Sequence, residues 1–357
     1  MRRYYAFFMS AFSPVRIAAT LLLALAAALC CVWLRVPLPW FIGPLLATAI
    51  ASMLRAPTAS WAPLRNAGQC TIGLALGLYF TPVMGALVLS LWWAVLLGIA
   101  WALLLGWLFG LWLQRTQARH LPGLNRATTW FAGAIGAASE MTLLSERAGA
   151  RTDLVAAAHS LRLLIVAVLI PFGMQFAGVQ GVDLALTTPL AFDAQGLGLL
   201  VLLAGASALA LERLGYANPW FLGPMVLAMA LTLAGVELTG IPSVLSNTAQ
   251  LLIGVSLGVR FTPAFVHTAP RWLAAVAVGT LVMIVLSAGF GWLLSLGTGL
   301  HPATLLLGTA PGGIAEMSIT AKVLQLGAPV VTVFQICRLF AVLLLVDPLY
   351  RRLYPRP

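Results

Sequence analysis

The sequence has very little charge for its length. Of 357 residues, 20 are basic and 9 are acidic, which is 8% charged, whereas 61% are hydrophobic. A soluble domain carries about 25% charged residues, so these few charges cannot cover the surface of a soluble protein of this size. The apolar residues form blocks of about 20, the length of a helix that crosses a bilayer. The sequence therefore predicts an all-α polytopic membrane protein and excludes the soluble enzyme folds.

Lysine is almost absent, and no basic helix or arm is present. Lys322 is the one lysine, and the other basic residues are arginines that occur singly or in pairs between apolar blocks. A nucleic-acid-binding chain gathers such residues along one helix or arm. The net charge of +11 is instead explained by arginines gathered in cytoplasmic loops. We expect the lipid bilayer as a partner and no direct binding to nucleic acid.

Cysteine and histidine are equally sparse. The four cysteines lie in apolar segments without CxxC spacing, and the four histidines show no HxH or ExxH spacing. Disulfides and centres of zinc, copper or iron are therefore not expected. Because a phosphate-binding loop and a nucleophile elbow are also missing from the sequence, we expect no cofactor and no enzymatic activity.

Three ordered blocks occur twice in the chain. Pro39–Pro44 returns as Pro219–Pro224, and residues 66–82 align without gaps to 247–263 with nine of seventeen identical. In each half a Glu-Met pair is followed by an arginine 22 residues after the glutamate. The sequence therefore predicts two homologous membrane repeats, 1–178 and 195–357, joined by a periplasmic linker, 179–194.

Each half holds six apolar segments. They are approximately 17–34, 38–54, 66–80, 84–112, 127–145 and 154–176, then 197–214, 218–236, 247–261, 272–296, 302–320 and 328–349. If 127–145 and 302–320 enter and leave on the same side, sixteen basic residues are cytoplasmic and two external, against eleven and seven if every segment crosses. Five crossings per half predict an inverted-topology repeat with both termini cytoplasmic.

A helix break is predicted in the second of these non-crossing segments. Pro311 lacks an amide hydrogen, and Gly312 and Gly313 follow it, so a continuous helix is disfavoured. Glu316 comes three residues later, and the first half keeps the equivalent Glu140 without the Pro-Gly-Gly. A carboxylate inside an apolar segment is costly and is a candidate for function. The alternative is that each glutamate caps the first turn of its own helix.

Arg162 and Arg338 lie in the following span, preceded three residues earlier by His159 and Gln335. A buried arginine needs a partner within the protein. One interpretation pairs each arginine with the glutamate of its half. The other has Arg338 and the open amides after the break hold an anionic solute, since the guanidinium fork suits carboxylate or phosphate.

Polar residues also recur on the third segment of each half. Asn247 and Gln250 share a helical face at i, i+3 spacing, as do Asn66 and Gln69. Such residues either join helices or line a pore. The candidate solute or ion-binding residues are therefore Pro311, Gly312, Gly313, Glu316, Arg338, Glu140, Arg162, Gln250 and Asn247.

These repeated blocks resemble the bacterial membrane AbrB family, whose members contain two AbrB duplication domains. The family pattern Pro-Gly-Gly-x-x-Glu-Met falls on Pro311–Met317, whereas the first half matches it only at Gly136, Glu140 and Met141. The resemblance implies a protein of the bacterial inner membrane. The family also carries two functional labels, regulator of gene expression and ammonia monooxygenase. The second label fits this sequence poorly, because the sequence offers no metal cluster.

Two functions follow as hypotheses. The first is a transporter-like protein that binds or moves a small, anionic solute or a proton near Glu316 and Arg338. The second is a membrane-embedded regulator that senses a ligand and acts on gene expression through a protein partner. The sequence is compatible with a homo-oligomer in both cases.

Overall fold

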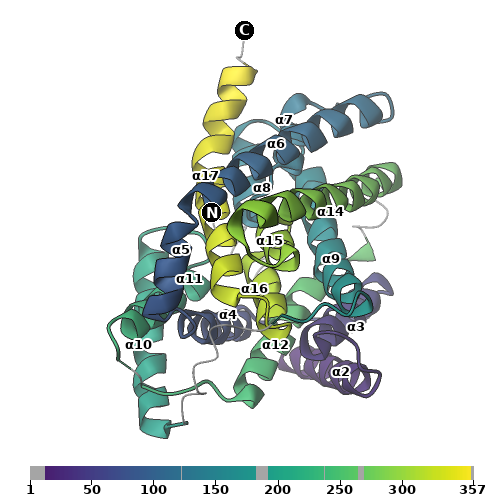
Figure 1. The fold of residues 1–357 in the computed structure, drawn as a ribbon. Coiled ribbons are helices and arrows are strands. Elements are labelled where there is room, and N and C mark those ends of the chain that lie inside the picture. The colour runs from purple at the N-terminus through teal and green to yellow at the C-terminus, as the bar shows by residue number, and fades with distance from the viewer. Residues whose placement is uncertain (1–12, 122, 182–191, 237, 264–268, 355–357) are drawn as a thin grey trace. The chain divides into compact units, whose positions relative to one another are not determined.

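The computed structural model describes residues 13–121, 123–181, 192–236, 238–263 and 269–354. Within these ranges the chain forms fifteen helices and no strand. Six helices are long and apolar enough to cross a membrane: α2 (Pro14–Trp33), α6 (Trp92–Gln117), α9 (Thr152–Phe176), α10 (Ala194–Arg213), α14 (Pro270–Thr298) and α17 (Ala328–Leu353). The all-α polytopic membrane fold predicted from the composition is confirmed (Figure 1).

Several predicted spans are divided or short. α4 (Ala62–Gly77) and α5 (Pro82–Ser90) meet at a bend of 87°. The segment expected at 84–112 is interrupted at Leu91, whose backbone leaves the helical conformation. The Ser90 hydroxyl next to it donates to the Leu87 carbonyl at 2.7 Å. α3 (Pro39–Met53) and α11 (Pro219–Leu233) have only 15 residues each. The number of crossings per half stays a prediction.

Two compact units divide the chain. Unit 1 comprises residues 1–75, 190–228 and 237–268, which include α2, α3, α10, α12 (Ser243–Gly258) and most of α4 and α11. Unit 2 comprises 76–189, 229–236 and 269–357, with α5 to α9 and α14 to α17. Each unit thus takes helices from both sequence halves. The division into two repeats stays a prediction, and most of the expected linker, residues 182–191, lies outside the described residues.

Glycines set the helix packing in unit 1. A Cβ on Gly254 of α12 would lie 2.6 Å from the Phe41 carbonyl oxygen of α3, and one on Gly73 of α4 would collide with the Phe221 carbonyl of α11. Each contact joins a helix of the first half to a helix of the second, α3 to α12 and α4 to α11. Bulkier residues at either glycine would push the helices apart.

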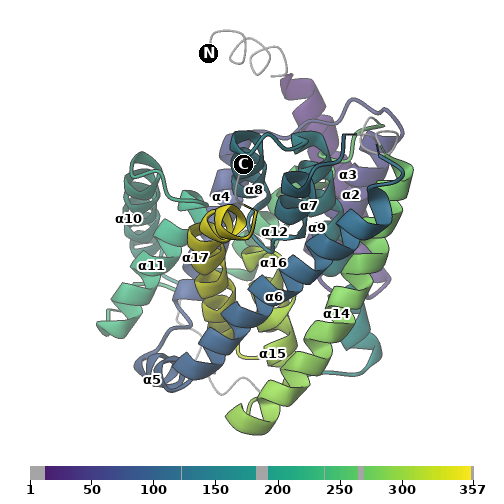
Figure 2. The same ribbon diagram turned by 90° about the horizontal axis from the view of Figure 1, so that it is seen from above.

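Unit 2 is built around the long helices α6, α9, α14 and α17. α6 and α14 lie side by side (Figure 2), with the Trp101 ring stacked on Phe290 at 4.5 Å between centroids. Trp272 of α14 is fully buried in this core. Four short helices lie against the long ones: α7 (Arg126–Gly133), α8 (Ala138–Arg147), α15 (Pro302–Thr309) and α16 (Ile314–Val323).

Helices at equal positions in the two halves have nearly equal lengths. α2 and α10 have 20 residues, α4 and α12 have 16, α7 and α15 have 8, α8 and α16 have 10, and α9 and α17 have 25 and 26. Among the described residues the order of the helices is the same as well, except that α5 has no described counterpart between α12 and α14. A duplicated chain would have this arrangement.

Candidate functional site at two broken helices

Among the described residues, the non-crossing segment predicted in each half is a broken helix, and both of these breaks lie in unit 2. α15 ends at Thr309 and α16 begins at Ile314, so the break contains Pro311, Gly312 and Gly313. In the first half, α7 ends at Gly133 and α8 begins at Ala138 without a proline between them. The broken segment predicted in each half is confirmed. Figure 1 shows α15 and α16 beside α17, which follows them in the chain.

Arg338 holds the end of α15 from the neighbouring α17. Its Nη1 donates to the Ala310 carbonyl at 2.6 Å, and its Nη2 donates to the Gly312 carbonyl at 2.8 Å. Gln335, one turn earlier, donates to the Leu307 carbonyl at 2.6 Å. The last carbonyls of a helix have no partner in the helix itself and carry partial negative charge. These buried side chains therefore satisfy the backbone that the break leaves open.

Arg162 repeats this arrangement in the first half. Its Nη2 donates to the Ala134 carbonyl at 2.9 Å, and its Nη1 lies 3.3 Å from the Ala132 carbonyl. His159 takes the place of Gln335, with Nε2 2.9 Å from the Phe131 carbonyl and Nδ1 2.8 Å from Arg162. The contacts of Arg162 with Ala134 and of His159 with Phe131 lie 176 residues before those of Arg338 with Ala310 and of Gln335 with Leu307. The second carbonyl differs, since Arg162 approaches Ala132 and Arg338 donates to Gly312. Both arginines thus donate to backbone carbonyls, and the alternative that pairs each arginine with the glutamate of its half stays a prediction.

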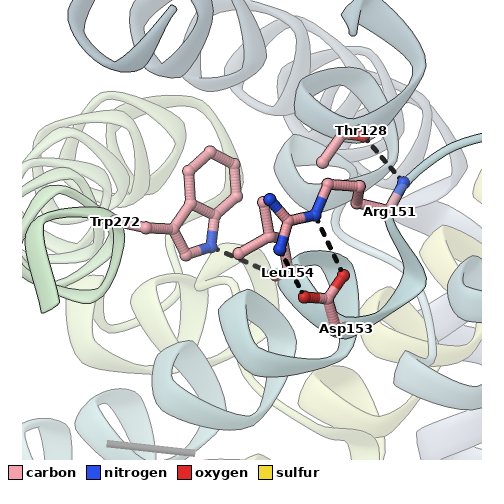
Figure 3. A network of polar contacts seen from close by, with 5 residues as sticks. All are labelled: Thr128, Arg151, Asp153, Leu154 and Trp272. Carbon is pink, nitrogen blue, oxygen red and sulfur yellow. Dashed lines mark hydrogen bonds and ion pairs between the residues drawn. The ribbon is translucent and has the colours of Figure 1, made fainter. Parts of the chain in front are cut away.

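The start of α9, which carries Arg162, is anchored on two sides (Figure 3). The Arg151 amide donates to the Thr128 hydroxyl of α7 at 2.9 Å, and the Trp272 indole of α14 donates to the Leu154 carbonyl at 3.1 Å. Asp153 in the first turn forms a salt bridge of 2.7 Å with Arg151. These contacts fix the position of α9 along its own axis, and therefore the position of Arg162 relative to the break.

Glu316 is buried in the first turn of α16, where it is the third helical residue after the N-terminal cap Gly313. Its carboxylate folds back over Gly313, because a Cβ on that glycine would collide with Oε2. The same Cβ would lie 3.2 Å from Leu163 of α9, so this end of α16 faces α9. A glutamate at this position reaches back to the cap in a capping box. The structure thus brings Glu316 to the break, at the positive end of a half-helix.

The first half differs at this point. Ala137 occupies the position equivalent to Gly313, and Glu140 is only partly buried. A methyl group at Gly313, the equivalent of the Ala137 side chain, would collide with the Glu316 carboxylate. The two sites therefore share the arginine contact to the residue that follows the first short helix, Ala134 or Ala310, and differ in the burial of the glutamate.

Two other candidate residues lie elsewhere. Asn247 and Gln250 belong to α12 in unit 1, where Gln250 is buried and Asn247 is partly exposed. One polar pair was not singled out from the sequence: the Thr332 hydroxyl of α17 donates to that of Ser318 in α16 at 2.9 Å, with both residues fully buried. Serine and threonine are common in membrane helices, so the sequence held no signal for this pair.

Comparisons with known proteins cover most of the chain. The family model described as "Transition state regulatory protein AbrB" matches residues 40–354. A protein of Bacillus subtilis (strain 168), described as "Uncharacterized protein YhjN", is 24% identical over 339 residues, which covers 88% of this chain and 87% of that protein. No solved structure matches the chain.

Proposed function

The chain belongs to the AbrB family, and we propose that it binds a small anionic solute at the α15–α16 break and moves it across the membrane. The observation that carries this proposal is the buried Glu316 at the N-terminal end of α16, folded over Gly313. Helix N-termini attract anions through their amides and the helix dipole. A half-helix that begins inside a membrane protein is tolerated where it lines a cavity or is covered by protein.

In this proposal Glu316 competes with the solute. While ionised, its carboxylate occupies the positive end of α16, as an internal anion. Protonation would remove that charge and allow the carboxylate to be displaced by an anionic solute. A proton and an anion would then bind together, which is the coupling expected of a secondary transporter.

The arginines have a supporting role in the proposal. Arg338 and Arg162 donate to backbone carbonyls at the ends of α15 and α7, so they keep the two breaks open and do not supply the main contact to the solute. Their positive charge still raises the affinity of the region for an anion.

An inverted-topology repeat, which the sequence predicts, would support the transport proposal. The matched helix lengths and the arginine contacts repeated at 176 residues are the features expected of a duplicated transporter, whose substrate site lies at broken helices. Fold resemblance alone does not establish transport, so the test must measure binding and flux.

The first experiment measures the melting temperature of the purified protein in detergent with a panel of small anions and cations. A ligand at 100 times its Kd stabilises by about 2.7 kcal/mol, which is visible as a shift. We expect an anion to give a shift that Glu316→Gln alters and the matched Glu140→Gln leaves unchanged. Uptake of that anion into proteoliposomes, faster with an inward proton gradient, would support transport. Equal shifts in all three proteins would refute a site at Glu316.

A second candidate is a membrane-embedded regulator of gene expression that acts through a protein partner. It is favoured by the description of the matching family as a transition state regulatory protein. Ligand binding at Glu316 without any flux in proteoliposomes would favour this candidate over transport.

A further inference from the structure

An apolar crevice opens in unit 2 between α6, α7 and α17. Leu103 and Trp107 of α6 form one wall, and Val346 of α17 lies opposite. Its lining also includes Ala134 and Ile135, the first residues of the break after α7. The crevice therefore reaches the backbone to which Arg162 donates, and its lining contains no charged residue.

The lining has almost nothing to offer a polar occupant. The indole N–H of Trp130 is already donated to the Val346 carbonyl at 3.2 Å, and the Ala134 carbonyl accepts from Arg162. Trp107 stands at the mouth with 38% of its surface exposed. Water needs two or more polar partners to occupy a cavity, and a charged solute needs more. This lining therefore suits a hydrocarbon chain better than a polar or charged solute.

Aromatic rings connect Trp130 of the crevice lining to Arg126. Trp130 contacts the rings of Tyr350 and Tyr354, with centroids 6.0 and 5.9 Å apart. The Arg126 guanidinium lies over the Tyr354 ring, 5.2 Å from its centroid. Arg126 precedes Trp130 by about one turn of α7, and the Tyr354 ring connects this exposed cation to the Trp130 ring of the lining.

The same end of unit 2 carries further positive charge. Arg115 ends α6, Arg147 ends α8, and Arg352 lies in the last turn of α17. The α8–α9 turn is joined to the start of α7, since Asn125 donates to the Gly149 carbonyl at 2.8 Å. Basic residues next to an apolar groove between membrane helices favour an anionic lipid head group.

We propose that this crevice binds one anionic phospholipid. An acyl chain lies between Trp107 and Val346 against Ile135, and the phosphate lies at Arg126 beside Tyr354. Such a lipid would stabilise the α7–α8 break from the membrane side. The proposal concerns a different surface from the solute site at Glu316, so either can fail without the other.

The test uses the full chain, delipidated in a neutral detergent and titrated with phosphatidylglycerol or with phosphatidylcholine of the same acyl chains. We expect phosphatidylglycerol to raise the melting temperature more than phosphatidylcholine and to remain bound, one per chain, in native mass spectrometry. Arg126→Gln should weaken its apparent affinity about fivefold, the contribution of one basic residue near an anionic head group, and Arg126→Lys should restore most of it. Arg271→Gln, at an exposed arginine that starts α14, is the matched charge control.

A second variant tests the crevice itself. Leu103→Trp fills it from a half-buried position and should abolish retention of the lipid. If this variant fails to fold, the comparison of Arg126→Gln with Arg126→Lys decides. Equal effects of the two lipids, or equal weakening by Arg126→Gln and Arg271→Gln, would overturn the proposal. So would a wild-type dimer that Leu103→Trp converts to a monomer, because a second copy would then fill the crevice.

Discussion

The guanidinium of Arg338 donates to the carbonyl oxygen of Ala310, 2.6 Å away, at the point where α15 ends. Arg162 does the same at Ala134, where α7 ends. A buried arginine in a membrane protein is commonly taken as a ligand for substrate or as half of an ion pair. Here the contacts of both arginines show a further role, which is to satisfy the carbonyls of a helix that stops inside the protein.

Replacing Arg338 by methionine should destabilise the protein by about 2–5 kcal/mol, because the carbonyls of Ala310 and Gly312 would lose charged donors in a buried place. Arg338→Lys should cost less, since the ammonium can still reach one carbonyl. The free energy of unfolding is measured by titration with denaturing detergent in mixed micelles. Arg271→Met, at an exposed site, serves as the control. A stability of Arg338→Met equal to that of the wild type would contradict the role.

Gly313→Ala should displace the Glu316 carboxylate, because the added methyl group collides with Oε2. The backbone of Gly313, with φ −82°, accepts alanine without strain, so the effect comes from the side chain. A double-mutant cycle with Glu316→Ala should give a coupling energy of about 1–3 kcal/mol. The reverse change at the equivalent position, Ala137→Gly, should have little effect. A coupling energy near zero would mean that the carboxylate does not depend on Gly313.

Arg55→Gly should stabilise the protein by about 0.5–1 kcal/mol. Arg55 follows α3 with φ 66°, a left-handed conformation that favours glycine, and Gly235 holds the equivalent position after α11 with φ 74°. Arg55→Ala, which removes the charge without adding glycine, is the control and should give no gain. Melting temperatures of the three proteins check this. If alanine stabilises as much as glycine, the charge and not the backbone is responsible.

The predicted topology places the linker outside the cytoplasm and the loop after α6 inside it. In a chain without its four native cysteines, Ala185→Cys should react with an impermeant thiol reagent in intact, outer-membrane-permeabilised cells. Residue 185 lies outside the described residues. Ala118→Cys, exposed after α6, should react only after lysis. Protection of position 185 in intact cells would refute the topology.

The two breaks differ in how well their own residues predict them. Pro311, Gly312 and Gly313 predict an interrupted helix because proline lacks a donor and glycine disfavours helix, and the structure breaks there. The first break has no proline, so its own residues do not predict an interruption. It is predicted only because this segment aligns with the Pro-Gly-Gly segment of the second half. It forms because Arg162 and His159, 25 or more residues later, supply donors to the end of α7.

The sequence by itself determined the membrane-spanning class, the helical content, the position of the breaks and the family. These follow from local apolar length, from helix-breaking residues and from repeated motifs. Only the tertiary structure decided that Arg338 donates to backbone carbonyls, that Glu316 folds over Gly313, and that each compact unit takes helices from both halves. The physical reason is that a buried charge takes the partners that packing brings to it, and those partners lie on helices distant in the sequence.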